Sequence, residues 1–88
     1  MDRDQLLALF PVAVVQDRYQ GTYSHGGWLA IANADQLVEG VPRASWVLEY
    51  GPHGEDTEAA DFWVDPPDWI AAGASADAAI ERLVQQHG

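Results

Sequence analysis

Prolines and glycines divide this chain into short segments, and their positions constrain its fold more than any other feature. Pro11 stops one apolar run, Gly51-Pro52-His53-Gly54 ends another, and Pro66-Pro67 separates two more. Proline removes a backbone donor and disfavours helix in the residue before it, so no helix or strand is expected to cross these points. The 88 residues suffice for a single core. We therefore expect one domain, residues 1–88, built from short elements.

Two apolar segments early in the chain predict a pair of strands. Val12 to Val15 is small or β-branched, and Trp28 to Ala32 is apolar on both sides. The glycine-rich stretch between them, residues 20–27, permits the positive φ angles of a turn. A hairpin is therefore predicted from Tyr19 to Trp28.

Helices are predicted at both ends of the chain and in its second half. Ser75 is placed to cap a helix that extends to His87. The apolar residues of this predicted helix recur with a period of 3.6 residues. A short N-terminal helix, capped by Asp2 or Asp4, is expected before Pro11. Residues 56–64 are expected to form another short helix, with a strand as the alternative.

The remaining apolar segments predict further strands and complete the fold class. Trp46 to Tyr50 has the period-two pattern of a half-buried strand, and Trp69 to Gly73 reads as a brief strand. The sequence thus predicts an α+β fold with a three- or four-stranded, mainly antiparallel sheet. The helix from Ser75 to His87 is expected on one face of the sheet, and the second face is expected to be partly open.

The charge balance limits the partners of this chain. Fourteen carboxylates face four arginines and no lysine, which gives a net charge of −10. This charge argues against direct binding to nucleic acid or to an anionic membrane. The expected partner is a basic protein surface, such as that of a nucleic-acid-binding protein, with the chain itself a monomer or a homodimer. The acidic N-terminus, the interrupted apolar run after it and the absence of cysteine predict a cytoplasmic protein.

An acidic stretch supplies the candidate binding residues. Nine carboxylates and no basic side chain lie between Arg43 and Arg82. Carboxylates three or four apart on a helix are about 5–6 Å from one another, similar to phosphates along a nucleic-acid strand, so an ordered acidic face can imitate a duplex. Pro66-Pro67 prevents the row from lying on one helix. The acids expected to bind the partner are Glu49, Glu55, Asp56, Glu58, Asp61, Asp65 and Asp68. The alternative is a solvated surface that only promotes solubility.

No motif in the sequence predicts catalysis or metal binding. His53-Gly54-Glu55-Asp56 lacks the ligand alternation of a calcium loop, and Ser24-His25 lacks a Gly-x-Ser-x-Gly context. Residues 21–27 are glycine-rich without the Gly-Lys-Ser/Thr ending that holds phosphate. We expect no catalytic residue, no metal site and no cofactor. A small metal-dependent or hydrolytic enzyme using His25 or His53 is the last-ranked alternative.

Aromatic side chains gather around the predicted hairpin. Arg18, Tyr19, Tyr23 and Trp28 are of the types enriched at interface hot spots, so Tyr19 and Tyr23 join the candidate partner-binding residues. The alternative is that the four tryptophans are core anchors.

Two segments resemble known families. The stretch from Asp17 to Trp28, Asp-Arg-Tyr-Gln-Gly-Thr-Tyr-Ser-His-Gly-Gly-Trp, resembles one in short acidic proteins of phages and bacterial mobile elements. More loosely it is similar to the opening of plasmid antirestriction proteins, which mimic DNA, without the Tyr-Asn pair of their motif. Pro67 to Leu83 is similar to the strand and alanine-rich helix of HicB-like antitoxins.

The leading functional hypothesis is a non-enzymatic inhibitor that mimics DNA. It would bind a nucleic-acid-handling defence protein, such as a restriction or CRISPR effector, through its acids. The alternative is an antitoxin- or immunity-like module that engages its partner through a sheet edge or through aromatics around Tyr19, Tyr23 and Trp28. A structural or housekeeping domain whose acidity only aids solubility is a further alternative.

Overall fold

The computed structural model describes residue 4 and residues 7–87 of the chain. The elements in chain order are β1 (Ala13–Gln16), β2 (Trp28–Ile31), β3 (Leu37–Val38), β4 (Val41–Pro42), α2 (Arg43–Glu49), the 3-10 helix η1 (Gly51–His53), α3 (Asp56–Val64), β5 (Ile70–Gly73) and α4 (Ala76–His87). The predicted α+β class is confirmed.

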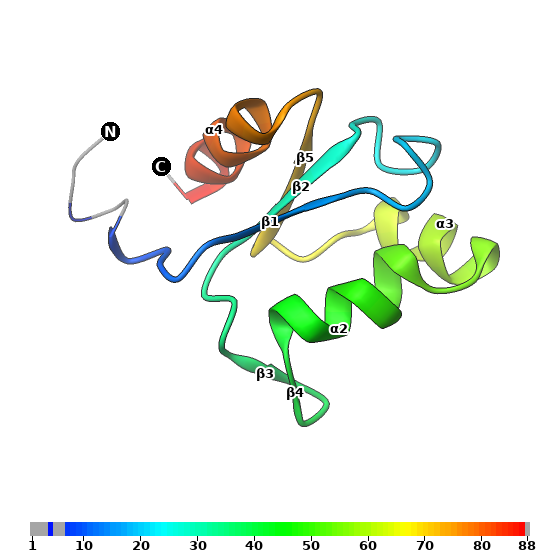
Figure 1. Ribbon diagram of the computed structural model, residues 1–88, viewed down its shortest axis with the longest axis horizontal. Helices are drawn as coiled ribbons and strands as arrows, with labels where there is room; N and C mark the ends of the chain where they lie inside the picture. Colours follow the sequence, from blue (N-terminus) through cyan, green and yellow to red (C-terminus); the bar gives the residue numbers. More distant parts are fainter. Residues whose placement is uncertain (1–3, 5–6, 88) are drawn as a thin grey trace.

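The main sheet has three antiparallel strands in the order β1-β2-β5 (Figure 1). Val14 pairs with Ala30, and Ala30 pairs with Ala71 on its other side. The predicted pairing of the first two apolar segments is therefore correct, with residues 17–27 as a long connection between them. Because β2 is central, β1 and β5 are both edge strands.

The helix α4 covers one face of this sheet, as predicted. The Oγ of Ser75 accepts a hydrogen bond from the N–H of Ala78 at 3.1 Å, which is the expected N-cap. Ala79 and Leu83 are fully buried, and they pack with Ala30 and Ala71 of the sheet. The 3.6-residue period of the apolar side chains thus fixes which side of α4 faces the core.

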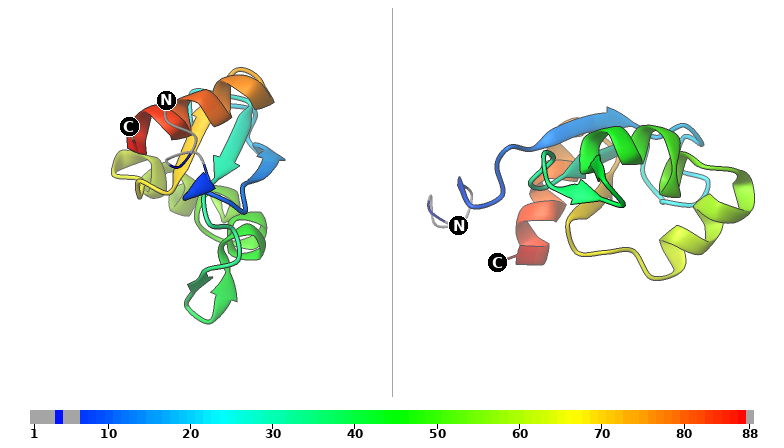
Figure 2. Two further views of the ribbon diagram at one scale, coloured as in Figure 1. Left: turned by 90° about the vertical axis from the view of Figure 1, so that its left-hand side faces the viewer. Right: turned by 90° about the horizontal axis from the view of Figure 1, so that it is seen from below.

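The other face of the sheet is covered by α2 and α3, where the sequence led us to expect a partly open surface (Figures 1 and 2). Leu29 and Ile31 of β2 point to this side because strand side chains alternate between faces. They pack with Val47 of α2 and Phe62 of α3. The sheet is therefore the middle one of three layers.

The predicted strand from Trp46 to Tyr50 is wrong, because these residues belong to α2 and its C-cap. In this helix Val47 is buried and Leu48 is 56% exposed, so the apolar residues do not share one face. An alternation over five residues fits a strand or one turn of a helix, and packing of Val47 against the sheet decides between them. Gly51, with a φ of 53°, follows the C-cap in the left-handed conformation that ends many helices.

A small hairpin, formed by β3 and β4, joins β2 to α2. β3 and β4 pair through a two-residue turn in which Glu39 and Gly40 both have positive φ, at 53° and 82°. Figure 2 shows this hairpin projecting from the layered body.

The helix expected before Pro11 falls largely on residues 1–3 and 5–6, which lie outside the described part of the chain. Of that segment, the N–H of Ala8 donates to the carbonyl of Asp4 at 3.0 Å. The helix predicted for residues 56–64 is confirmed as α3, and the brief strand near residue 70 is confirmed as β5.

Gly26 and Gly73 bring the hairpin loop, β5 and α4 into close contact. A Cβ on Gly26 would lie 2.6 Å from the nitrogen of Gly73, and one on Gly73 would lie 2.3 Å from the nitrogen of Ala79. Gly26 is thus required by a close approach of backbones, whereas Gly21 has the positive φ expected of a turn residue.

We predict that Gly26→Ala destabilises the fold and that Gly27→Ala does not. The new methyl group of Gly26→Ala meets backbone atoms that cannot rotate away, so a loss of about 1–3 kcal/mol is expected in chemical denaturation. A Cβ on Gly27 meets no atom within 4 Å, so this neighbouring variant is the control. Equal stability of the two variants would show that the backbones are not in contact at Gly26.

Candidate functional site

A groove of about 680 Å³ lies between the end of α2 and the first turns of α3. Four of the predicted partner-binding acids line it, namely Glu49, Glu55, Glu58 and Asp61. They meet because η1 reverses the chain between the two helices. Tyr50, which is 47% exposed, also lines the groove. The acidic groove is therefore a concave anionic surface with one aromatic wall.

The other three predicted acids do not line this groove. Asp56 lines a neighbouring hollow together with Tyr19 and Arg18. Asp65 is the C-cap of α3, and Asp68 follows the two prolines that end the row of acids. All seven carboxylates are exposed. The structure thus gathers four of them, places a fifth beside the groove and separates the last two.

Glu58 has a structural role in addition to its place in the groove. Its carboxylate accepts a hydrogen bond from the N–H of Gly51. A Cβ on Gly54 would lie 2.4 Å from the same carboxylate, so the chain is tightly packed here. Glu58 thereby fixes η1 against α3 and keeps the groove in shape.

Among the described residues, Arg18 is the one cation that lines the groove. Its guanidinium donates to the carbonyl of His53 at 2.9 Å and lies 5.2 Å from the centre of the Tyr19 ring. None of the four groove carboxylates forms an ion pair with a residue in the described part of the chain. Arg18 therefore reduces the negative charge of the groove without neutralising any single acid.

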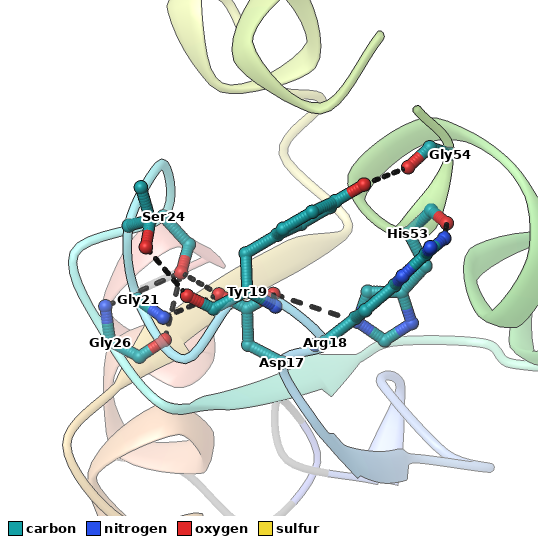
Figure 3. Close-up of polar contacts among 9 residues, drawn as sticks. Asp17, Arg18, Tyr19, Gly21, Ser24, Gly26, His53 and Gly54 are labelled. Carbon is teal, nitrogen blue, oxygen red and sulfur yellow. Dashed lines mark hydrogen bonds and ion pairs between the residues drawn. The ribbon is translucent and has the colours of Figure 1, made fainter. Parts of the chain in front are cut away.

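The loop that carries Arg18 is held by the buried carboxylate of Asp17 (Figure 3). This carboxylate accepts hydrogen bonds from the N–H groups of Tyr19 at 3.2 Å and Gly21 at 2.8 Å. It also accepts one from the hydroxyl of Ser24 at 2.7 Å. A buried charge is tolerated when its oxygens are satisfied in this way, and the loop is ordered around it.

Residues 18 and 19 attach this loop to η1 and the residue after it. The N–H of Arg18 donates to Nε2 of His53 at 3.0 Å, and the hydroxyl of Tyr19 donates to the carbonyl of Gly54 (Figure 3). Partial burial raises the pKa of the Tyr19 hydroxyl above its usual 10.0, against the opposing charge of Arg18, so it remains a donor at neutral pH. These contacts join the hairpin loop to the helical layer.

His53 is neutral in this arrangement. Its Nε2 accepts a hydrogen bond, so the proton of the neutral ring is on Nδ1. Burial lowers the pKa of His53 below 6.5, and the Asp17 carboxylate, 3.6 Å away, opposes this shift only in part. Protonation of Nε2 would break the bond from Arg18.

The neighbouring Ser24, Asp17 and His53 do not form a catalytic triad. In a triad the histidine lies between the serine and the acid and accepts the serine proton. Here Asp17 lies between the other two, and Ser24 donates to its carboxylate. The hydroxyl is thus an anchor for the loop, and His53 is not placed to accept its proton.

Residues 4 and 7–87 contain no group of three or more histidine, cysteine or acidic side chains that could hold a metal ion. His53 faces Asp17 and the Arg18 N–H, and Glu58 is bonded to Gly51, so the loop considered for metal binding does not present its side chains together. In the same described part, no helix has both the length and the apolar character needed to cross a bilayer.

The candidate aromatic residues face different surroundings. Tyr19 and Tyr23 make an edge-to-face contact with centroids 5.3 Å apart, but Tyr23 lines a separate hollow beside β5. Trp28 packs on the α4 side of the core and Trp46 and Trp63 pack on the other side, whereas Trp69 packs against both. The tryptophans are therefore half-buried core anchors.

Sequence reasoning did not find the pairing of Asp17 with His53. The local signal was an aspartate followed by Gly21 and Ser24, since aspartate often accepts hydrogen bonds from backbone groups a few residues ahead. No local signal indicates that His53 reaches this loop, because the contact joins distant parts of the chain.

Comparison of the chain with protein-family models, with curated proteins and with solved structures finds no match.

We predict that the protein loses stability as the pH falls below about 6.5. The pKa of His53 is lower in the folded protein than in the unfolded chain, so the unfolded chain binds a proton at a higher pH. Stability is therefore lost as the pH falls from the unfolded pKa to the lower folded pKa, and this loss stops below the folded pKa. Denaturation measured at about pH 7.5 and about pH 5 will show this loss. His53→Gln should reduce the loss. His25→Gln, which changes an exposed histidine, should leave it unchanged, and an equal effect of both variants would contradict the assignment.

Proposed function

We propose that this chain is a non-enzymatic binding module that presents its acidic groove to a basic surface of another protein. The observation that supports this function is the convergence of Glu49, Glu55, Glu58 and Asp61 on one groove. Evenly spread acids would serve solubility equally well, whereas a shared concave surface concentrates the negative potential.

The groove is suited to arginine and lysine side chains. Glu58 and Asp61 are three residues apart on α3, so their Cβ atoms are about 5–6 Å apart, and Glu49 and Glu55 approach from the connected segments. Tyr50 offers an exposed ring to a cation. Attraction by a net charge of −10 accelerates association with a basic partner.

Among basic partners, we propose a nucleic-acid-binding protein, with a restriction or CRISPR effector as the leading candidate. Such a protein holds phosphates in a positive groove, and closely spaced carboxylates satisfy the same side chains. The proposed mechanism is competition, since the acids occupy the surface that would otherwise bind DNA. We further propose that the protein acts in the cytoplasm, where such effectors bind DNA.

The charge of the groove can be tested with an arginine nonapeptide as the probe. We predict that Glu49→Gln combined with Asp61→Asn weakens binding several-fold, because both changes remove charge from the groove. The matched control is Asp35→Asn with Asp77→Asn, which removes the same charge at exposed positions outside the groove. Calorimetric titration should show a small effect for the control pair. Equal weakening by both pairs would show that binding depends on the total charge of the protein and not on the acidic groove.

The competition mechanism predicts a steep salt dependence with a real target. The chain should displace DNA from purified restriction or CRISPR effectors at about 50 mM salt and lose most of this ability by about 200 mM. Displacement that does not respond to salt, or an effector that binds DNA and the chain together, would contradict mimicry.

The contact between Tyr19 and Tyr23 favours one second candidate, an antitoxin- or immunity-like module. In that case Tyr23→Ala would abolish partner binding, and the pair of groove substitutions would leave it intact. The two variants thus separate the candidates.

A further inference from the structure

The outer edge of β5 is an unpaired strand edge. The N–H of Ala32 donates to the carbonyl of Trp69 at 2.8 Å, and Ala30 pairs with Ala71 in the same ladder. Hydrogen-bonded and non-hydrogen-bonded pairs alternate in an antiparallel ladder, so the backbone groups of Ile70 and Ala72 point away from β2. They face the side of the sheet where residues 4 and 7–87 supply no further strand.

One part of this edge is already covered by a side chain. The amide of Gln86 in α4 donates to the carbonyl of Ile70 at 3.1 Å and to that of Asp68 at 3.2 Å. It replaces the N–H groups that a neighbouring strand would supply. Ala72 has no such cover, and neither its N–H nor its carbonyl has a hydrogen-bond partner among residues 4 and 7–87. The backbone N–H and carbonyl of Ala72 are therefore unpaired, and since the residue is only 8% exposed, a ligand reaches them through the hollows that Ala72 lines.

Two adjoining hollows follow this open edge. Their volumes are about 160 and about 480 Å³, and both are lined by His25, Ala72 and Arg82. The smaller one is bounded by Trp63 of α3, by Pro66 shortly after this helix and by Arg82 of α4. The larger one is lined by Glu81 as well as Arg82. The smaller hollow thus has an apolar wall on one side and a cationic wall on the other.

Arg82 differs from the other arginines in the described part of the chain. Arg18 is bonded to the carbonyl of His53, and Arg43 is bonded to that of Ala32 and lies over the Trp69 ring. The side chain of Arg82 makes no hydrogen bond, ion pair or ring contact with a described residue. In a chain with fourteen carboxylates, a guanidinium that pairs with none of those described is free to bind an external anion.

We propose that the open edge of β5 docks an extended segment of another protein in which an acidic residue is flanked by apolar residues. The backbone of the segment pairs with the N–H and carbonyl of Ala72 and adds a strand to the sheet. Successive side chains of a strand point to opposite faces. The acidic side chain therefore reaches Arg82, while its two neighbours meet Trp63 and Pro66.

The charge of the whole molecule narrows the choice of ligand. A polyanion such as nucleic acid is repelled by the net charge of −10, whereas a single carboxylate can pair with the single guanidinium. The ligand is thus mostly neutral and carries one acid at the centre. This site shares no lining residue with the acidic groove, so it is separate from the function proposed above.

The probe for this site is the blocked peptide acetyl-Thr-Val-Glu-Val-Thr-amide, titrated into the isotope-labelled full chain and followed by NMR. The resonances of the Ala72 N–H and the Arg82 guanidinium should shift saturably, with a Kd in the millimolar range. Replacing Glu by Gln in the peptide should weaken binding about tenfold, because it removes a charge-assisted hydrogen bond.

Variants of the protein complete the test. Arg82→Gln should abolish the preference for the Glu peptide, and Arg82→Lys should retain part of it. Ser45→Asp is the control, since it changes the net charge as Arg82→Gln does, at an exposed position that lines neither hollow. Unchanged shifts elsewhere in each spectrum will show that the fold is intact. Equal shifts with both peptides, persistence of the preference in Arg82→Gln, or shifts away from β5 would overturn the proposal.

Discussion

The buried carboxylate of Asp17 is the interaction on which the arrangement of this molecule depends. An ionised carboxylate away from water is strongly unfavourable unless its oxygens accept hydrogen bonds, and two backbone N–H groups and the Ser24 hydroxyl supply them. The ordered loop then holds Arg18 and Tyr19 where they reach His53 and Gly54. The helical layer is thereby attached to the hairpin by polar contacts as well as by its apolar packing, and the position of the acidic groove follows from this attachment.

The parts of the fold that the sequence predicts are those decided by local patterns. Ser75 and the apolar period of α4 specify a capped helix, and the apolar runs of β1 and β2 specify a strand pair. The alternation from Trp46 to Tyr50 predicts a strand because so short a pattern does not distinguish a strand from a helix, and burial of Val47 against the sheet decides for the helix α2. Likewise the acids were identified from the run of charges, but the approach of Glu49 to Glu55 depends on the reversal at η1, which no local pattern encodes.

The helix α3 has two chemically different sides. Glu58 and Asp61 face the acidic groove, whereas Trp63 packs on the core and lines the hollow beside β5. The same short helix therefore forms a wall of each candidate binding surface. Charge and apolar surface are kept apart on it by the ordinary geometry of a helix, in which neighbouring residues point in different directions. A substitution on one side of α3 can thus alter one surface and leave the other intact.

The central position of β2 has a consequence for the order in which this chain assembles. β1 lies close to β2 along the sequence, but β5 joins β2 only after the whole stretch from Ala32 to Trp69. During synthesis from the N-terminus, the second edge of β2 thus remains unpaired until α2 and α3 have emerged. The backbone groups of Trp28, Ala30 and Ala32 on this edge are a template for pairing with other chains, so the interval before β5 arrives is the period in which a nascent molecule is most exposed to misassembly.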